Sequence, residues 1–312
     1  MSNLVSVIVP AYNEEGNIPE FVSLFDKMQR TSEYDFELIF IDDGSSDNTL
    51  ATIKNEAGKY NFIKYKKHPV NLGLTDALKS GFEIAEGGIY VFYPADLQYH
   101  PEDIPRLVEP IFKGADVTTG WKQGKYSKKF VSSVYNYLSR KIFGLKVHDL
   151  NSVKAFRAEI VNDIFLRRDW HRYMVVLAAD HGYRIEEVKL PLYERKWGKS
   201  KFSVLRIPVG VLDMLAVKTQ LTFLKKPLLF FGILGTIFVA LGTLVGLVAL
   251  YLRFIEDIGL RPLLYLVILL LGFGLGLFIL GFLTEGLTAL KEEMGAVRKK
   301  LNEIGSGTAK KE

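Results

Sequence analysis

The stretch that decides the fold lies near the start of the chain and reads Val5-Ser6-Val7-Ile8-Val9-Pro10-Ala11-Tyr12-Asn13-Glu14. Its first half is an apolar, β-branched run that is typical of a buried parallel strand, and polar residues follow at once. A second run of this kind, Phe36 to Ile41, leads into Asp42-Asp43-Gly44-Ser45-Ser46-Asp47. Because apolar residues recur at helical spacing from Ile18 to Met28, a strand, a helix and a second strand are predicted in this order.

The same alternation continues along the chain. A helical pattern from Thr49 to Tyr60 precedes a strand at Phe62 to Tyr65, and a helix around Ala77 to Ala85 precedes a strand at Ile89 to Tyr93. Four alternations predict a doubly wound α/β sheet, whose ligands bind outside the carboxyl ends of the strands. Since the polar motifs follow the strands directly, we expect the functional site at that edge.

Two uncharged apolar runs occupy the C-terminal third of the chain. They extend from Pro227 to Leu250 and from Pro262 to Thr284, with 24 and 23 residues. Each is longer than the roughly 20 residues that cross a hydrocarbon core. Two buried core helices are the alternative, but both runs exceed the usual length of such helices. We therefore interpret both runs as transmembrane helices.

Charges around these runs predict their orientation. Lysines precede the first run at Lys218, Lys225 and Lys226, basic residues follow the second, and the segment 251–261 has no net charge. The positive-inside rule then places the α/β domain and the C-terminal tail in the cytoplasm. The N-terminus lacks the features of a signal peptide, which agrees with this orientation.

The organisation predicted from these patterns has four parts. Residues 1–202 form the cytoplasmic α/β domain, which includes a basic amphipathic helix near 127–143. Residues 203–226 form an interfacial juxtamembrane helix, and residues 227–290 form a two-helix transmembrane anchor. Residues 291–312 form a charged cytoplasmic tail with a disordered end from Gly305. The chain has no cysteine, so disulfides, thiolate metal ligands and a cysteine nucleophile are excluded.

Acidic and amide side chains at the strand ends carry the candidate chemistry. Asp42 can accept hydrogen bonds from a base or a ribose, although a solvated turn with Asp47 capping the next helix is an alternative. After the fourth strand, Asp96 and Gln98 offer hard oxygen ligands suited to Mg²⁺ or Mn²⁺ on a diphosphate. The phosphate-binding P-loop and the GxGxxG fingerprint are both missing, which argues against ATPases and ordinary dehydrogenases.

Taken in order, these motifs resemble glycosyltransferase family two. The matching pieces are residues 5–14, residues 41–47, Asn71-Leu72-Gly73 at the start of a helix, and Ala95-Asp96-Leu97-Gln98. With the two apolar runs, the chain is similar to the polyisoprenyl-phosphate glycosyltransferases over residues 4 to about 290. This group includes dolichyl-phosphate mannose synthase and undecaprenyl-phosphate glucosyltransferases. The resemblance implies a GT-A fold and transfer of a sugar, with inversion, from a nucleoside diphosphate to a lipid phosphate.

The resemblance also implies roles for residues on the donor side. Asp96 and Gln98 would hold a Mg²⁺ or Mn²⁺ ion, with Asp96 counted as catalytic. The family usually has an Asp-x-Asp motif here, and Pro94 replaces its first Asp, which puts metal affinity in question. Arg195, Ser200 and Lys201 match a loop that closes over the diphosphate, or else form a basic juxtamembrane loop. The residues implied for the nucleotide are Pro10, Tyr12, Asn13, Glu14, Asp42, Asp43 and Gly73.

On the acceptor side, Asp149-Leu150-Asn151-Ser152 resembles the family's Asp-x-x-Ser stretch, although Val153 follows in place of the usual Gly. Asp149 is the candidate for the carboxylate that orients the acceptor or acts as base, with a structural turn as the alternative. A lone His at His171 is expected to pack or hydrogen-bond. The region implied for the lipid phosphate contains Lys122, Lys128, Lys129, Ser132 and Ser133, which could equally form a basic face touching anionic lipid headgroups.

The function expected from these features is a membrane-bound inverting hexosyltransferase. Its partners would be a nucleoside diphosphate sugar, a polyprenyl phosphate such as dolichyl or undecaprenyl phosphate, and the membrane, with no nucleic acid. A UDP-hexose is slightly favoured over GDP-mannose, and a homo-oligomer fits the resemblance. The membrane would be the plasma membrane in a prokaryote and the endoplasmic reticulum in a eukaryote. The alternatives are transfer to a polysaccharide or a protein, and a non-catalytic scaffold that binds sugar nucleotides.

Overall fold

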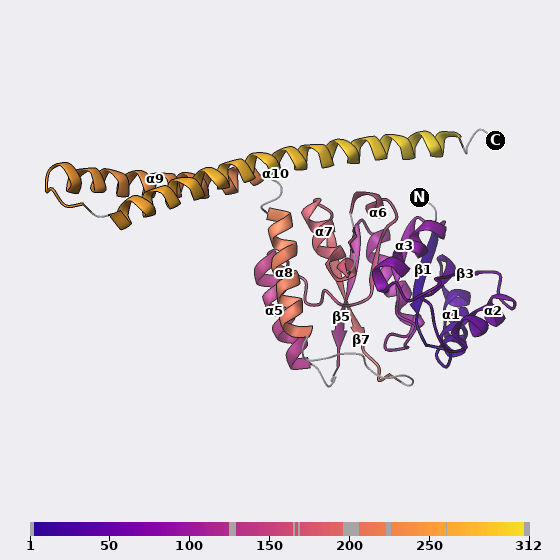
Figure 1. Cartoon of the computed structure of the whole chain (residues 1–312). Helices are drawn as coiled ribbons and strands as arrows, with labels where there is room; N and C mark the ends of the chain where they lie inside the picture. Colours follow the sequence, from indigo (N-terminus) through magenta and orange to yellow (C-terminus); the bar gives the residue numbers. More distant parts are fainter. Residues whose placement is uncertain are drawn as a thin grey trace. The chain divides into compact units, whose positions relative to one another are not determined.

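The structure, a computed structural model, describes residues 3–124, 129–164, 166–167, 169–195, 206–222, 226–259 and 261–308. The chain forms two compact units, Met1–Val211 and Leu212–Glu312 (Figure 1). The strands are β1 (Leu4–Ala11), β2 (Asp35–Asp42), β3 (Ile63–Lys67), β4 (Ile89–Phe92), β5 (Val117–Gln123), β6 (Lys154–Arg157) and β7 (Ile185–Pro191). The helices are α1 (Ile18–Thr31), α2 (Thr49–Ala57), α3 (Leu74–Ile84), η1 (Pro101–Asp103), α4 (Ile104–Phe112), α5 (Lys129–Phe143), α6 (Ile160–Asp163), η2 (Trp170–Tyr173), α7 (Met174–Asp180), α8 (Arg206–Thr222), α9 (Pro227–Phe254) and α10 (Arg261–Thr308).

The first unit is built on one seven-stranded sheet with the order β3-β2-β1-β4-β6-β5-β7. The doubly wound sheet predicted from the sequence is confirmed, with β1 parallel to both β2 and β4. β6 runs antiparallel to both of its neighbours, β4 and β5, which the sequence did not predict. Because β6 runs in the opposite direction, the segment that precedes it lies at the edge where β4 and β5 end.

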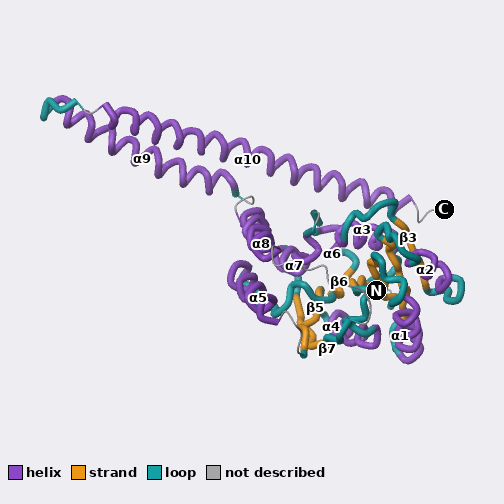
Figure 2. The backbone as a smooth tube through the Cα atoms, turned by 60° about the horizontal axis from the view of Figure 1, so that its bottom comes forward, coloured by secondary structure: helices purple, strands orange, loops and turns teal. Residues whose placement is uncertain are grey.

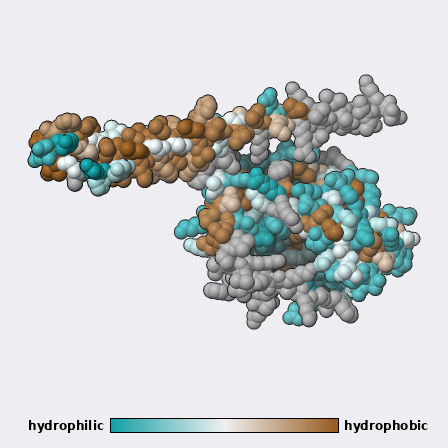
Figure 3. Space-filling model, in the orientation of Figure 1, coloured by the Kyte–Doolittle hydropathy of each residue, from teal (hydrophilic) through white to brown (hydrophobic). Residues whose placement is uncertain are grey.

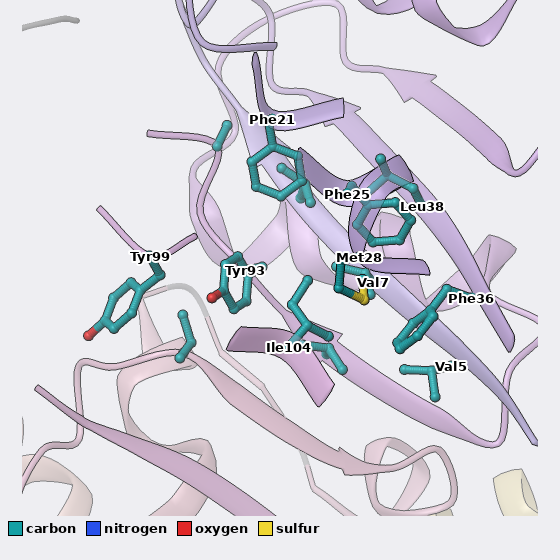
Figure 4. Packing of buried hydrophobic residues seen from close by; sticks show 14 of the residues in the cluster. Val5, Val7, Phe21, Phe25, Met28, Phe36, Leu38, Tyr93, Tyr99 and Ile104 are labelled. Carbon is teal, nitrogen blue, oxygen red and sulfur yellow. The ribbon is translucent and has the colours of Figure 1, made fainter. Parts of the chain in front are cut away.

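Alternating side chains of β1 divide between the two faces of the sheet. On one face, Val5 and Val7 pack with Phe21 and Phe25 of α1, and all four side chains are fully buried (Figure 4). Burying a side chain of this size contributes about 2 kcal/mol. Phe21 and Phe40 meet edge to face, with 5.9 Å between ring centroids, which is a favoured aromatic arrangement.

The opposite face of the sheet is covered by α3, which packs against β1 and β2. Gly81 faces the side chain of Ile8, and a Cβ atom at Gly81 would lie 2.3 Å from Ile8 Cγ2. The sheet therefore lies between helices in the layered arrangement seen in Figure 2. This packing fixes the positions of the strand ends, where the polar motifs lie.

Predicted and observed element limits agree closely along most of the first unit. The strand β5, Val117–Gln123, was not predicted from the sequence. The basic helix predicted over 127–143 is α5, of which residues 127 and 128 lie outside the described residues. The helix predicted over 204–224 is α8, described from Arg206 to Thr222.

The second unit contains two long apolar helices, α9 and α10. The segments Pro227–Phe254 and Arg261–Gly295 are long and apolar enough to cross a membrane, with hydropathy of 2.5 and 2.8. In the most apolar stretch of each helix, only 11% and 6% of the residues are buried. The apolar side chains of both helices are therefore exposed (Figure 3). A soluble core helix would bury such a surface, so these helices are candidate membrane spans.

α10 extends further than the sequence predicted. We expected disorder from Gly305, but the helix continues to Thr308, so that prediction is wrong for residues 305–308. An isolated glycine costs a helix only about 1 kcal/mol relative to alanine, which a long helix tolerates. Residues 309–312 lie outside the described residues.

Candidate active site

Two loops at the carboxyl edge of the sheet are joined by hydrogen bonds. They follow β1 and β2, whose last residues Ala11 and Asp42 are neighbours in the strand register. Asn13 adopts a left-handed conformation with φ of 58°, which asparagine tolerates better than most residues. Its N–H donates to Ser45 Oγ at 3.0 Å, and its Oδ1 accepts from Ser46 N–H at 2.9 Å. Asn13 therefore fixes the two loops to one another.

Asp42 presents an unpaired oxygen at this edge. Its side chain is 1% exposed, and Oδ1 accepts a hydrogen bond from Ser45 N–H at 3.0 Å. Oδ2 is buried and has no hydrogen-bond partner within the described part of the chain. An unsatisfied buried acceptor costs about 1–3 kcal/mol. A ligand that donates an N–H or O–H group here would remove this cost.

Asp43 differs from its neighbour because both of its oxygens are used inside the protein. Oδ1 accepts from Leu72 N–H at 2.9 Å and contacts His68 Nδ1 at 2.8 Å, while Oδ2 accepts from Gly73 N–H at 2.8 Å. Gly73 has a φ of 92°, a conformation that favours glycine. Asp43 and Gly73 thus shape the loop before α3, and direct contact of Asp43 with a nucleotide stays a prediction.

Glu14 connects the first loop to the rest of the site. Its N–H donates to Thr49 Oγ1 at 2.8 Å. Burial raises the pKa of Glu14, a hydrogen bond from Asn17 lowers it, the charge of Asp96 raises it and that of Arg195 lowers it. Glu14, Asp96 and Arg195 therefore share one electrostatic environment. Pro10 and Tyr12 lie beside it and are half-buried.

The predicted metal ligands lie on a tight turn after β4. Gln98 N–H donates to Asp96 Oδ1 at 3.1 Å, and Leu97 between them has a φ of 55°. A non-glycine residue in this conformation costs about 1–3 kcal/mol, and such strain is found mainly at functional sites. Asp96 is 7% exposed, and its Oδ2 is paired with the guanidinium of Arg195. The structure therefore brings Asp96, Gln98 and Arg195 together.

The segment that carries Arg195 is attached to the same turn. Tyr193 N–H donates to the carbonyl of Gln98 at 2.9 Å. The Tyr193 ring stacks on His100 with 3.8 Å between centroids. These contacts position Arg195 beside Asp96. The predicted loop residues Ser200 and Lys201 lie outside the described residues.

Asp149 lies in the turn before β6 and is 2% exposed. Its Oδ1 accepts from Asn151 N–H at 2.9 Å. Its Oδ2 lies 3.1 Å from Lys122 Nζ, which is an ion-pair distance. The angles at the two atoms are not those of a hydrogen bond. The charge attraction does not need those angles, so Asp149 and Lys122 form an ion pair. Two predicted acceptor-side residues are thus in direct contact.

Lys154, a residue that the sequence interpretation missed, lies close to this pair. It is 1% exposed and donates to the carbonyl of Ser152 at 2.8 Å. Burial lowers the pKa of Lys154 to about 7; Asp149 opposes this shift, and Lys122 and Arg172 add to it. The available signal was a lysine inside the apolar, strand-like run Val153 to Phe156, where a solvated charge is not expected.

His171 and Arg172 of η2 lie in the same region. Burial, with the charges of Lys154 and Arg172, lowers the pKa of His171 to about 3. Thr75 Oγ1 lies 3.1 Å from His171 Nδ1. His171 is therefore a neutral, hydrogen-bonded residue, as the sequence predicted.

A buried hydrogen bond connects the Asp96 turn to the Asp149 turn. Tyr99 Oη and Ser152 Oγ lie 2.8 Å apart, and both side chains are buried. Because Tyr99 follows Gln98 and Ser152 follows Asn151, this hydrogen bond holds the two turns next to one another. The strands that carry them, β4 and β6, are adjacent in the sheet.

The remaining acceptor-side predictions fall on α5. Lys129, Ser132 and Ser133 belong to this helix, but the positions of these side chains are outside the described part, as is Lys128 altogether. The helix contacts η2, where Tyr135 Oη and Tyr173 Oη lie 3.2 Å apart. Its role toward a lipid stays a prediction.

The sequence of this chain is similar to those of known glycosyltransferases. Residues 6–165 match glycosyl transferase family 2. The chain is 32% identical over 295 residues to the dodecaprenyl-phosphate galacturonate synthase of Rhizobium johnstonii, covering 90% of this chain and 86% of that protein. It is 30% identical over 258 residues to the undecaprenyl-phosphate 4-deoxy-4-formamido-L-arabinose transferase of Proteus mirabilis, covering 81% of this chain and 78% of the relative.

A solved structure shares the fold. Glucosyl-3-phosphoglycerate synthase from Mycobacterium tuberculosis, in complex with Mn²⁺, uridine diphosphate and glucosyl-3-phosphoglycerate, superposes with a TM-score of 0.56 at 21% identity. The match covers 69% of this chain and 79% of that structure. At this identity the likeness concerns the fold alone, and it confirms the expected GT-A-like core. The chain belongs to glycosyl transferase family 2 and is a glycosyltransferase.

Proposed function

We propose that the protein transfers a sugar, with inversion, from a nucleoside diphosphate sugar to a polyprenyl phosphate at a membrane surface. The observation that carries the proposal is the buried Tyr99–Ser152 hydrogen bond, which joins the Asp96 turn to the Asp149 turn. The donor-side carboxylate of Asp96 and the acceptor-side pair of Asp149 and Lys122 would then belong to one site. The two relatives named above support the lipid acceptor, since both names specify a polyprenyl phosphate.

The nucleotide is proposed to bind over the ends of β1 and β2. The unpaired Oδ2 of Asp42 suits an N–H of a base or a hydroxyl of a ribose. Asn13, Asp43 and Gly73 shape the loops around it, and Pro10, Tyr12 and Glu14 line the start of the site. A UDP-sugar stays the slightly favoured donor, with GDP-mannose as the alternative.

The side-chain oxygens of Asp96 and Gln98 fit a divalent cation of the Mg²⁺ or Mn²⁺ type. Within the described ranges, no three acidic or histidine side chains gather to make a metal site from protein alone. Mg²⁺ is commonly held by only one or two carboxylates together with substrate phosphates. Here the Asp96 carboxylate and the Gln98 amide would be the protein ligands, and the diphosphate of the donor would supply the others. When bound, the cation would neutralise charge on the departing diphosphate. Arg195, now paired with Asp96, would then exchange that carboxylate for the diphosphate.

The chemical step is a single displacement. An oxygen of the lipid phosphate attacks the anomeric carbon of the sugar, and the bond from that carbon to the nucleoside diphosphate breaks. The phosphate is already ionised near neutral pH, since its second pKa is about 6, so it needs little help from a base. Asp149 and Lys122 would mainly orient the acceptor, and positioning of this kind can supply several kcal/mol of the barrier.

α9 and α10 are proposed to anchor the enzyme in the membrane that holds its acceptor. The lysines before α9 and the basic residues beyond the apolar part of α10 support an orientation with the catalytic domain on the cytoplasmic face. On that face a soluble sugar nucleotide and a lipid phosphate headgroup are both accessible. Association into a homo-oligomer is compatible with this arrangement and stays a proposal.

Transfer is tested by incubating the detergent-purified full chain with undecaprenyl phosphate, Mn²⁺ or Mg²⁺ and a panel of radiolabelled UDP- and GDP-sugars. Label that enters the organic phase only with metal and acceptor present is the expected result. Replacement Asp96→Asn should lower transfer by about 100-fold or more, because it weakens binding of the cation that would balance the charge of the departing diphosphate. The matched replacement Asp26→Asn, on the surface of α1, should leave transfer unchanged. Label that enters no lipid with any donor, or normal turnover in the Asp96 variant, would contradict the proposal.

A further inference from the structure

The surroundings of Asp149 contain more positive than negative charge. Lys122 is in contact with Asp149 at 3.1 Å. Asp149 and Arg172 both lie close enough to Lys154 to shift its pKa. Among the described residues that act on Lys154, three cations thus face one carboxylate. Lys154 and Asp149 are buried, where unbalanced charge is costly. The cluster has one positive charge in excess while Lys154 is neutral and two once Lys154 is protonated.

Several hydrogen-bonding groups in this cluster also have unused capacity. An ammonium group has three donors, and Lys154 makes one hydrogen bond within the described part, to the carbonyl of Ser152. Arg172 Nε is buried without a hydrogen-bond partner there. Unused donors beside excess positive charge indicate a ligand that carries several acceptor oxygens and two negative charges. A phosphate monoester has this chemistry.

We propose that Lys154, assisted by Arg172, is the buried counter-charge for the phosphate dianion of the acceptor, and that Lys154 takes up a proton when this phosphate reaches Lys122. The inference rests on the proposed function and adds a positioning residue to it. The step converts the neutral amine of Lys154 to an ammonium with a proton from solvent. Lys154 would act on the acceptor through its charge, which interacts with both Asp149 and Lys122.

The titration behaviour of the cluster fits this role. With a pKa of about 7, Lys154 is mostly neutral at pH 8 when the site is empty. A dianion nearby favours the charged form. His171 faces the same region but has its pKa lowered to about 3, so it stays neutral and takes no part.

The same charge balance distinguishes the substrate from the product. Transfer converts a phosphate monoester dianion into a phosphodiester with one negative charge. The cluster then has one positive charge too many, which favours return of the proton from Lys154 to solvent. Charge balance therefore favours binding of the acceptor over the glycosylated product.

Proton uptake can be measured directly. The detergent-purified full chain is titrated at pH 8 with geranyl phosphate, a ten-carbon isoprenyl monophosphate, by calorimetry in two buffers of different ionisation enthalpy. A pKa of about 7 predicts uptake of up to about 0.9 proton per phosphate bound. Lys154→Met should abolish the uptake and weaken binding by about tenfold, equivalent to one pKa unit of coupling. Lys154→Arg should keep the affinity but show no uptake, because a guanidinium stays charged throughout.

The controls separate this inference from a general loss of structure. Lys113→Met, at an exposed lysine paired with Glu109, should behave like the unmodified chain. Uptake that persists in Lys154→Met, or binding without uptake in the unmodified chain, would overturn this inference alone. Failure of geranyl phosphate to bind the unmodified chain would overturn the proposed function as well. Inorganic phosphate is titrated in parallel, and equal affinity and uptake would overturn the assignment to a lipid.

Discussion

At the scale of single residues, burial and hydrogen bonding separate two adjacent carboxylates. Asp43 uses both oxygens to hold His68 and the loop before α3, whereas Asp42 keeps a buried oxygen without a partner in the described part. The sequence Asp42-Asp43 cannot show this difference, because both residues follow the same strand. Asp43 therefore supports the fold, and contact of Asp42 with a nucleotide stays a proposal.

Matched replacements should therefore give opposite results. Asp42→Asn puts a donor where a ligand donor is expected, so UDP affinity should fall by about 10- to 100-fold with little change in stability. Asp43→Asn should lower the free energy of unfolding by about 1–3 kcal/mol, because a charge-assisted hydrogen bond is lost. Calorimetric titration with UDP and denaturant unfolding followed by tryptophan fluorescence measure the two effects. Equal destabilisation in both variants would show that Asp42 is structural too.

At the scale of secondary structure elements, close approach of α3 to β1 depends on a single glycine. A Cβ at Gly81 would lie 2.3 Å from Ile8 Cγ2, and the branched side chain of Ile8 has little freedom to move away. This contact helps to position the strand ends that are proposed to bind the nucleotide. A similar close approach joins α9 to α10, where a Cβ at Gly235 would lie 2.8 Å from the carbonyl oxygen of Gly274. Small residues that permit such packing are common between membrane helices.

Gly81→Ala should accordingly destabilise the first unit by about 1–3 kcal/mol through overpacking. The comparison is Gly58→Ala at the end of α2, where a Cβ would meet no atom closer than 3.5 Å. That change should be neutral or slightly stabilising, since alanine reduces the entropy of the unfolded chain. Urea midpoints of the full chain in detergent, followed by tryptophan fluorescence, provide the measurement. Equal midpoints for the two variants would show that α3 can shift away from β1 at little cost.

At the scale of the whole molecule, two compact units divide the work. The first contains the candidate site, and the second supplies two helices with exposed apolar surfaces. Contact of such large apolar surfaces with water is unfavourable. Both the acceptor and the anchor would then belong to the same lipid phase. The proposed orientation places the loop between α9 and α10 on the side opposite to the catalytic domain.

This orientation can be tested because the chain has no cysteine of its own. A single cysteine is introduced either at Asp257, between α9 and α10, or at exposed Glu33 in the first unit. In intact cells, a membrane-impermeant maleimide should label Asp257→Cys at once and Glu33→Cys only after permeabilisation. The reverse pattern would place the catalytic domain outside the cell membrane, and labelling of both without permeabilisation would contradict the two-span anchor.

Local patterns in the sequence were sufficient for the features that contiguous residues encode. Alternation of apolar runs predicted the doubly wound sheet. The motifs at Asn13, Asp42 and Asp96 were expected at one edge of the sheet, and the structure places them there, because a parallel strand fixes the position of the residues directly after it. The length of the apolar runs predicted the candidate spans. Each of these predictions depends on spacing within about 25 residues, which a chain displays directly.

Contacts between distant residues, in contrast, were settled by tertiary packing alone. The antiparallel direction of β6 brings the Asp149 turn to the edge where β4 ends, and the sequence had no signal for that direction. The burial of Lys154 and the pairing of Arg195 with Asp96 follow from this placement and from the contacts of Tyr99 and Tyr193. These features depend on registers between strands far apart in the chain, so their energies are set by packing and local dielectric, which periodicity does not record.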